Sequence, residues 1–276
     1  MSSIGPYIVP PAALDSPDMT YLQFHLVFTF PAIIALKLAA PRVNLGDTTK
    51  KAVSLLAITA IAFLYTTPWD NYLVQTEVWG YGEGRVLATL GYVPIEEYAF
   101  FILQPLLTGL WLYRLMDKGV HQPLPKPAAH PWIRWGGTLF WIALSGLGAL
   151  IFAEESYRYL ALILVWACPM IAIQWAYGGH HLWRMGRLTF LAVAVPTLYL
   201  WVADRIALEL GIWHISETFT TGWMLFGLPI EEALFFLVTN MLVVQGVILL
   251  LYTWRFKPLR QPQQTRHTQH AKPVAA

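Results

Sequence analysis

The sequence carries little charge and almost no cysteine. Only 12% of its 276 residues are Asp, Glu, Lys or Arg, about half the roughly 25% of a typical soluble domain. The 18 Lys and Arg nearly balance the 16 Asp and Glu, so the basic surface that nucleic-acid binding requires is excluded. The single cysteine, Cys168, excludes a disulfide framework, a Cys-rich zinc site and a cysteine-ligated iron–sulfur cluster.

The sequence motifs of several common enzyme classes are also missing. The sequence has no P-loop, no G-x-S-x-G, no H-E-x-x-H, no DDxxD-type cluster and no G-x-G-x-x-G after a strand. His180 and His181 are adjacent, but we expect them in a cytoplasmic loop, where such a pair is more often solvated than metal-bound. We therefore expect no cofactor and no metal.

Hydrophobic residues, in contrast, make up 57% of the chain. A helix needs about 20 apolar residues to cross the roughly 30 Å hydrocarbon core of a bilayer. Seven stretches fit this length: Tyr21–Ala39, Ala52–Pro68, Val93–Leu115, Trp135–Phe152, Tyr159–Tyr177, Leu188–Ile206 and Pro229–Tyr252. The pattern predicts an all-α integral membrane protein with seven transmembrane helices.

The charges are sorted between the two ends of these stretches. Segments 37–51, 114–134, 178–187 and the tail from 255 hold 4, 4, 2 and 5 of the 18 Lys and Arg, while 14 of the 16 acids lie on the opposite side. The positive-inside rule then places the N-terminus outside and the C-terminus in the cytoplasm. We expect the membrane to be that of a prokaryotic cell.

The sequence contains an internal repeat. Pro94-Ile95-Glu96-Glu97 recurs identically 135 residues later as Pro229-Ile230-Glu231-Glu232, and a Phe pair follows each copy. Other matched pairs, in the same order and at offsets of 134 to 138, are Tyr21 and Tyr159, Pro31 and Pro169, Asp70 and Asp204, and Trp79 and Trp213. An odd number of helices per repeat would invert the second copy, but one connecting helix restores its orientation. The pattern therefore predicts two parallel three-helix repeats, with both P-I-E-E motifs near the non-cytoplasmic face.

This interpretation divides the chain into five parts. They are a non-cytoplasmic N-terminal segment (1–20), repeat 1 (21–118), a linker with the connecting helix (119–156), repeat 2 (157–254) and a disordered cytoplasmic tail (255–276).

Acidic residues are the first candidates for chemistry. The two Glu pairs occupy the first helical turn, where the helix dipole favours a negative charge, so solvated interfacial glutamates are one interpretation. Ionisable groups at membrane depth are nevertheless functional candidates by default. Because neighbouring helical residues point about 100° apart, Glu97 shares a polar face with Gln104 and Thr108, which favours the second Glu of each pair as cavity-facing. All four remain candidates: Glu96, Glu97, Glu231 and Glu232.

Asp70 and Asp204 end outward-going helices and should lie at the level of the glutamates. A carboxyl cluster in an apolar pocket is expected to keep at least one proton, although loop acids in water would also fit. Aromatic residues gather toward the same face, where they either form an interfacial belt or stabilise a cation through their ring faces. The candidates are Trp69, Trp79, Tyr98, Phe100, Phe101, Trp213, Phe235 and Phe236.

The duplicated P-I-E-E with its Phe pair, preceded by Asp70/Asp204 and Trp79/Trp213, resembles the carotenoid lycopene cyclases of the heterodimeric type, in their fused single-chain form. The resemblance covers roughly residues 20–252. It implies redox-neutral isomerisation of lycopene to β-rings, first γ-carotene and then β-carotene, without a cofactor. An acid protonates the terminal double bond, the cation closes a ring, and a base removes a proton. These roles would fall on the four glutamates.

Other readings are open at this stage. Another carotenoid end-group enzyme, such as a hydratase, would trap the cation with water, and a proton-coupled seven-helix transporter would place its acids near the midplane. The expected partners are the bilayer and the carotenoid substrate. Other enzymes of carotenoid biosynthesis are candidate partners, and a monomer could suffice. If lycopene lies across the membrane, only one end reaches the acids at a time, which favours one composite site.

Overall fold

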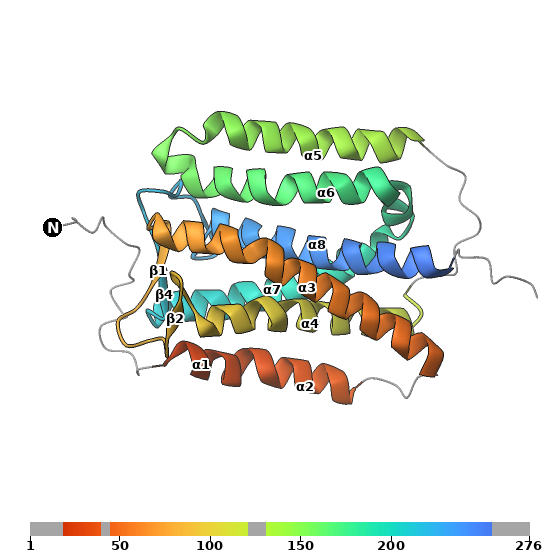
Figure 1. The fold of residues 1–276 in the computed structure, drawn as a ribbon, viewed down its shortest axis with the longest axis horizontal. Coiled ribbons are helices and arrows are strands. Elements are labelled where there is room, and N and C mark those ends of the chain that lie inside the picture. Colours follow the sequence, from red (N-terminus) through yellow and green to blue (C-terminus); the bar gives the residue numbers. More distant parts are fainter. Residues whose placement is uncertain (1–18, 40–44, 121–130, 256–276) are drawn as a thin grey trace, which may run out of the picture.

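The apolar stretches form long helices in the computed structural model, which describes residues 19–39, 45–120 and 131–255. The first rod comprises α1 (Tyr21–Phe24), a π-helical turn η2 (His25–Thr29) and α2 (Phe30–Leu38). The others are α3 (Leu45–Gln75), α4 (Ile95–Asp117), α5 (Pro131–Ile151), a short 3-10 turn η3 (Glu155–Tyr157), α6 (Arg158–Arg184), α7 (Gly186–Glu209) and α8 (Ile230–Arg255). Figure 1 shows the long helices running side by side.

Six helical segments of the described residues are long and apolar enough to cross a membrane. They correspond to α1–α2, most of α3, α4, η3–α6, α7 and most of α8. The sequence predicted a seventh span over Trp135–Phe152, which forms α5. This helix is not among the six. The all-α membrane class is confirmed at the level of six candidate spans.

Some predicted boundaries are wrong. Pro68 does not end a helix but lies inside α3, which continues to Gln75. His180 and His181 lie in a short helical segment at the end of α6, not in a loop, but this segment follows a kink at Gly178, next to the predicted boundary at Tyr177, and only Met185 separates it from α7. Proline and glycine interrupt membrane helices less than soluble ones because neighbouring helices re-satisfy the freed backbone groups. Most of the predicted N-terminal segment 1–20 (1–18), residues 40–44, part of the predicted linker (121–130) and the predicted tail from 256 onward lie outside the described residues.

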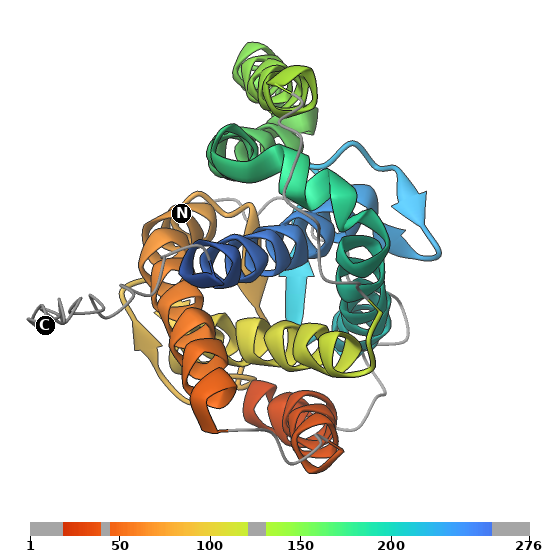
Figure 2. The ribbon, with the colours of Figure 1, turned by 90° about the vertical axis from the view of Figure 1, so that its right-hand side faces the viewer.

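Four helices make the centre of the bundle. α3 packs on α4 and α8, α7 packs on α8 and α4, and α4 and α8 contact each other. The α1–α2 rod covers α4 on one side, while α6 covers α8 on the other and carries α5 on its outer surface (Figures 1 and 2). The first rod and α6 therefore have matching places around the central four helices.

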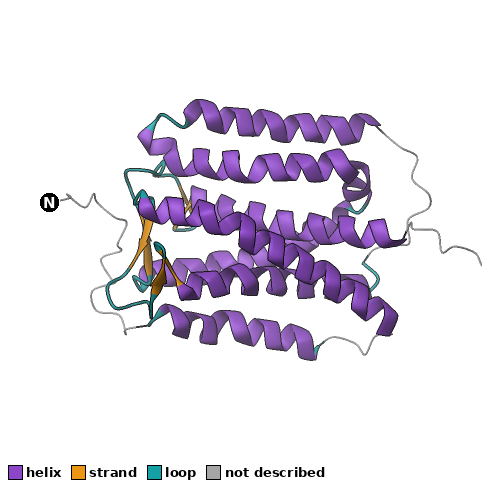
Figure 3. Cartoon of the chain, in the orientation of Figure 1, coloured by secondary structure: helices purple, strands orange, loops and turns teal. Residues whose placement is uncertain are grey.

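Short strands gather at one end of the bundle (Figure 3). β1 (Trp79–Tyr81) pairs antiparallel with β4 (Trp213–Ile215), and Gly80 lies opposite His214. Two tight hairpins, β2 (Thr89–Leu90) with β3 (Val93–Pro94) and β5 (Met224–Leu225) with β6 (Leu228–Pro229), lead directly into α4 and α8. Gly91 and Gly227 supply the turns with φ of 71° and 81°, a region that glycine enters without steric cost. These hairpins fix where the two Glu pairs begin.

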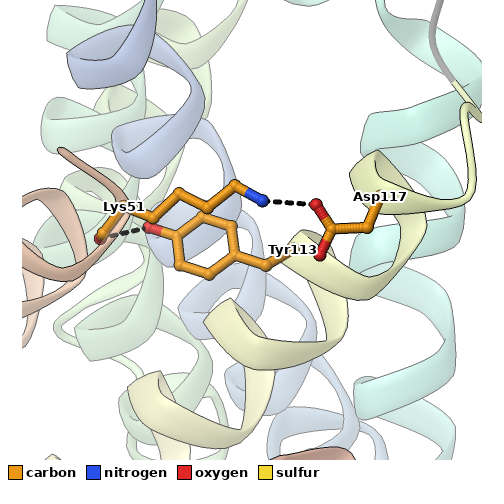
Figure 4. A network of polar contacts seen from close by, with 3 residues as sticks. All are labelled: Lys51, Tyr113 and Asp117. Carbon is orange, nitrogen blue, oxygen red and sulfur yellow. Dashed lines mark hydrogen bonds and ion pairs between the residues drawn. The ribbon is translucent and has the colours of Figure 1, made fainter. Parts of the chain in front are cut away.

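At the other end, α3 and α4 are joined by polar contacts (Figure 4). Lys51 forms an ion pair with Asp117. The Tyr113 hydroxyl donates a 2.7 Å hydrogen bond to the Lys51 carbonyl oxygen, and the Lys51 ammonium group lies 5.4 Å from the centre of the Tyr113 ring. These contacts fasten the two helices far from the P-I-E-E motifs.

Candidate active site

A cavity lies at the strand end of the bundle, between the two halves of the chain. Its empty volume is about 480 Å³. Its lining comes from α1, β1 and α4 on one side and from α7, β4 and α8 on the other: Tyr21, Phe24, Trp79, Tyr81, Glu97, Phe100, Leu200, Asp204, Trp213, Glu232, Phe235 and Phe236. The lining thus joins three carboxyl groups to six Phe and Trp side chains and two tyrosines, and no Lys or Arg of the described residues contributes to it.

Glu97 is held by two tyrosine hydroxyls. Tyr21 donates to Glu97 Oε2 over 2.6 Å, and Tyr81 donates to the same oxygen over 3.2 Å. Tyr21 is placed by the start of α1, where Thr20 and Gln23 form a reciprocal capping box that satisfies the first free N–H groups of the helix. Tyr81 comes from β1, so a strand and a helix together orient this carboxyl group.

Glu232 has the equivalent arrangement in the second half of the chain. Tyr159, near the start of α6, donates to Glu232 Oε2 over 2.7 Å. Tyr159 and Tyr21 are a matched pair of the repeat, as are Glu232 and Glu97. The counterpart of Tyr81 at offset 134 is Ile215, which has no hydroxyl to donate. Glu97 therefore accepts from two hydroxyls and Glu232 from one among the contacts found.

The first glutamate of each pair points elsewhere. Glu96 Oε1 accepts a 2.8 Å hydrogen bond from the Leu87 backbone N–H, and Glu231 Oε1 accepts one of 2.7 Å from the Thr221 N–H. Neither residue lines the cavity. The turn of about 100° between neighbours sends one carboxyl group to the preceding loop and the other to the cavity. Glu96 and Glu231 thus tie the loops to the helix starts.

The two aspartates differ. Asp204 lines the cavity, and its Oδ1 accepts a 2.9 Å hydrogen bond from Trp213 Nε1. Asp70 is fully buried and does not line the cavity, and within the described part of the chain neither of its carboxyl oxygens has a hydrogen-bond partner. The matched Trp79 Nε1 is likewise buried without a partner there. The hydrogen bond between Trp213 and Asp204 therefore has no counterpart between the matched residues Trp79 and Asp70.

The predicted aromatic residues divide into two groups. Trp79, Phe100, Trp213, Phe235 and Phe236 line the cavity. Trp69 lies behind it, stacked on Trp166 at 4.4 Å between ring centres and on Phe235 at 5.7 Å. Tyr98 is turned outward, where its hydroxyl donates to the Leu90 carbonyl oxygen, and Phe101 lines a neighbouring cavity. Trp69, Tyr98 and Phe101 are therefore not part of the cavity lining.

Tyr21, Tyr81 and Tyr159 contact the glutamates but were not predicted as site residues. The sequence could have identified Tyr21 and Tyr159 as site residues, because they are a matched pair of the repeat. Nothing in the sequence marks Tyr81, since it lies in a short strand and has no tyrosine counterpart in the second half. Burial raises the pKa of the Tyr81 hydroxyl well above its usual range, and the neighbouring carboxyl groups of Glu97 and Asp70 act in the same direction when they are ionised. Tyr81 therefore keeps its proton and can donate it to the Glu97 hydrogen bond.

No group of three or more His, Cys, Asp and Glu residues in the described ranges has a geometry that could hold a metal ion. The cavity contains acids and hydroxyl donors, and its other surface is hydrocarbon and aromatic. Such a lining can donate and accept protons next to an apolar molecule. Aromatic ring faces can also stabilise a cation where water is excluded.

Two curated proteins align with this chain over most of its length. The chain is 43% identical over 240 residues to the lycopene beta-cyclase of Halobacterium salinarum, covering 85% of this chain and 96% of that protein. It is 41% identical over 237 residues to the bifunctional lycopene cyclase/phytoene synthase of Colletotrichum graminicola, covering 82% of this chain but 40% of the fungal protein. No family model and no solved structure match the chain. Identity of this extent over nearly the whole relative means that the chain belongs to the lycopene beta-cyclase family.

Proposed function

We propose that this protein cyclises the linear ends of lycopene to β-rings, giving γ-carotene and then β-carotene, by a proton-initiated isomerisation inside the acid-lined cavity. The observation that carries the proposal is the pair Glu97 and Glu232, each held by a tyrosine in a shared aromatic cavity. Membership of the lycopene beta-cyclase family supports the substrate.

The reaction balances without a cofactor. One glutamic acid adds its proton to the terminal double bond of the end group and leaves a tertiary cation. The π electrons of the neighbouring double bond attack this cation, which forms the ring bond and moves the positive charge to a ring carbon. A carboxylate then takes a proton from the adjacent ring carbon, and the C–H electrons become the ring double bond. One proton enters and one leaves, so the product is an isomer.

The hydroxyl contacts suggest how the two glutamates share the work. Glu97 Oε2 accepts two donated hydrogen bonds and Glu232 Oε2 accepts one. Donated hydrogen bonds favour the charged form of a carboxyl group, so Glu97 suits the base and Glu232 suits the acid. A proton must then return from Glu97 to Glu232 between turnovers. Asp204 lies on the same cavity wall and is the candidate relay.

The aromatic lining serves the cationic intermediate. Trp79, Trp213 and Phe235 present ring surface to the cavity, and a cation near a desolvated ring gains about 2 kcal/mol. Hydrocarbon walls also keep water from the cation, which would otherwise give an alcohol. This lining favours a cyclase over the alternative of a hydratase. A proton-coupled transporter is disfavoured because Glu97 and Glu232 lie at helix starts and not at mid-helix.

We propose seven transmembrane helices, with α5 as the seventh, an outside N-terminus and a cytoplasmic C-terminus. α5 packs side by side against α6, with the two helix axes aligned (Figure 1), and this supports a seventh span. The sorting of basic residues supports the orientation. The cavity then opens near the non-cytoplasmic face of a prokaryotic membrane. Labelling of single engineered cysteines in a Cys168→Ala background tests this: Gly84→Cys should react with an impermeant reagent in whole cells, and Lys118→Cys should not.

We also propose that the chain is a fused form of two parallel three-helix units, residues 21–118 and 157–254, joined by α5. The matched contacts of α3 with α4 and α8, and of α7 with α8 and α4, support a two-fold relation along the membrane normal. The antiparallel β1–β4 pairing joins equivalent segments of the two units. One cavity then serves as a composite active site within a single chain.

Production of the protein in a bacterium that accumulates lycopene tests the function. Pigment analysis should show γ-carotene and β-carotene in place of lycopene. The double variant Glu97→Gln/Glu232→Gln, produced at the same level, is the matched control and should leave lycopene unchanged. Hydroxylated end groups would indicate a hydratase, and unchanged lycopene with well-expressed wild-type protein would contradict both enzymes.

A further inference from the structure

A second cavity lies deeper in the bundle, among α3, α4, α6 and α8. Its empty volume is about 690 Å³. Phe100 and Phe235 line both this cavity and the acid-lined one. The two spaces are therefore neighbours, with a pair of phenyl rings at their shared boundary.

The walls of this second cavity suit a hydrocarbon. Ile58 and Ala62 of α3, Met170 of α6 and Leu242 of α8 contribute apolar surface, and within the described ranges no Asp, Glu, Lys, Arg or His lines the space. The amide nitrogens of Gln104 and Gln174 are engaged with Asn240 Oδ1 at 2.6 Å and the Leu242 carbonyl oxygen at 2.9 Å. Gln174 Oε1 and Trp166 Nε1 have no hydrogen-bond partner among the described residues, so the lining is mainly apolar with two unpaired polar atoms.

The cavity reaches the outer surface of the bundle. Ile61, one of its lining residues, is 51% exposed on α3. Figure 2 shows α3 and α6 on different sides of α8, and both contribute to the lining. In a membrane this opening faces lipid, which is where a long hydrocarbon dissolves.

An aromatic stack closes the cavity toward the strand end of α3 and α6. The Tyr65 hydroxyl donates a 2.9 Å hydrogen bond to the Trp166 carbonyl oxygen, and the two rings stack with centres 5.7 Å apart. Trp69 also stacks on Trp166, with ring centres 4.4 Å apart. A long molecule that enters from lipid is therefore directed inward, toward Phe100 and Phe235, and not along the outside of the bundle.

We propose that this second cavity holds the conjugated chain of the substrate next to the end group that is being cyclised, and that the substrate enters from lipid between α3 and α6. This inference rests on the proposed function. If it holds, both ends of the substrate reach the composite site by the same route. The first cyclised end must leave past Phe100 and Phe235 before the second end can enter.

Binding can be measured without turnover. The Glu97→Gln/Glu232→Gln variant in lipid nanodiscs is titrated with lycopene, and the circular dichroism induced in the visible band of the bound polyene reports occupancy. Adding Ala62→Trp fills the second cavity and should weaken binding at least tenfold. The matched control Leu64→Trp, on the same helix at a residue that is 72% exposed and lines neither cavity, should change it less than twofold.

Met170→Trp fills the cavity from α6 and keeps the test valid if Ala62→Trp does not fold. Unchanged lycopene binding in a folded filling variant would overturn the inference. Failure of the proposed function is distinguishable: wild-type protein would leave lycopene uncyclised, while binding would still depend on residues 62 and 170. A wild type that cyclises lycopene together with filling variants that bind it normally would contradict the second cavity alone.

Discussion

At the residue scale, adjacent and identical side chains take different parts. Glu96 and Glu97 differ in what they touch: Glu96 accepts from the Leu87 backbone N–H, whereas Glu97 accepts from two hydroxyls at the cavity wall. The same division holds for Glu231 and Glu232. The proposed acid–base chemistry needs a carboxyl group in contact with the substrate. Only the second residue of each pair meets this condition.

Substituting the neighbours one at a time separates these parts. Glu97→Gln keeps the shape but removes the proton-transfer group, so the cyclisation rate should fall by about 10²- to 10⁴-fold. Glu96→Gln keeps an amide oxygen able to accept from the Leu87 N–H, so the rate should stay within about threefold while only stability changes slightly. Lycopene and β-carotene are quantified in membranes with matched protein levels. Equal losses in both variants would contradict the assignment.

Tyr81 gives a prediction on pH. Burial raises its pKa well above the usual range, so the hydroxyl stays protonated at pH 7 and at pH 9 and donates to Glu97 at both. Tyr81→Phe should therefore lower the cyclisation rate by the same factor, about 10-fold or roughly 1.4 kcal/mol, at the two pH values. Tyr98→Phe, whose hydroxyl contacts the Leu90 carbonyl oxygen, is the control. An effect of Tyr81→Phe that disappears by pH 9 would show that the hydroxyl ionises.

Sequence reasoning reached some of these residues and missed others for a physical reason. Helical periodicity separates Glu97 from Glu96, because a fixed angle of about 100° per residue relates neighbours on one helix. No such rule connects Tyr81 to Glu97, since a strand and a helix meet only through the tertiary fold. Trp69 was placed among the cavity residues on its position near the acids, but its ring stacks behind the wall.

At the scale of elements, the hairpins before α4 and α8 hold the glutamates in place. Gly91 and Gly227 have positive φ, and a β-carbon at Gly227 would lie 2.6 Å from Arg205 Nη1. Gly91→Ala and Gly227→Ala should each destabilise the protein by about 1 kcal/mol or more. Gly146→Ala in α5, where a β-carbon meets nothing within 4 Å, should be neutral or stabilising by up to about 1 kcal/mol. Thermal unfolding in detergent measures the stability of all three variants. If Gly91→Ala and Gly227→Ala were as stable as Gly146→Ala, this role of the turns would be contradicted.

The element order was predictable because apolar length and charge sorting are properties of single stretches. The bounds were less so. Pro68 lies within α3 although proline usually ends a helix, because membrane helices can satisfy freed backbone groups through their neighbours. The paired strands β1 and β4 had no signal, since each has only three residues and pairs across 134 positions. That pairing is what brings the two acid-bearing halves to one cavity.

At the scale of the whole molecule, the two halves contribute unequal parts to one site. Glu97 and Glu232 face the same cavity from α4 and α8, so we expect every ring closure to use both. Glu97→Gln alone and Glu232→Gln alone should therefore each leave lycopene with both ends open, and mixing the two variants in one membrane should not restore activity if a single chain forms the site. Two independent sites would behave differently, because each single variant would still close rings. Accumulation of one-ring γ-carotene from every lycopene molecule in both single variants would thus contradict the composite site, whereas restored β-carotene on co-production would show that chains exchange halves.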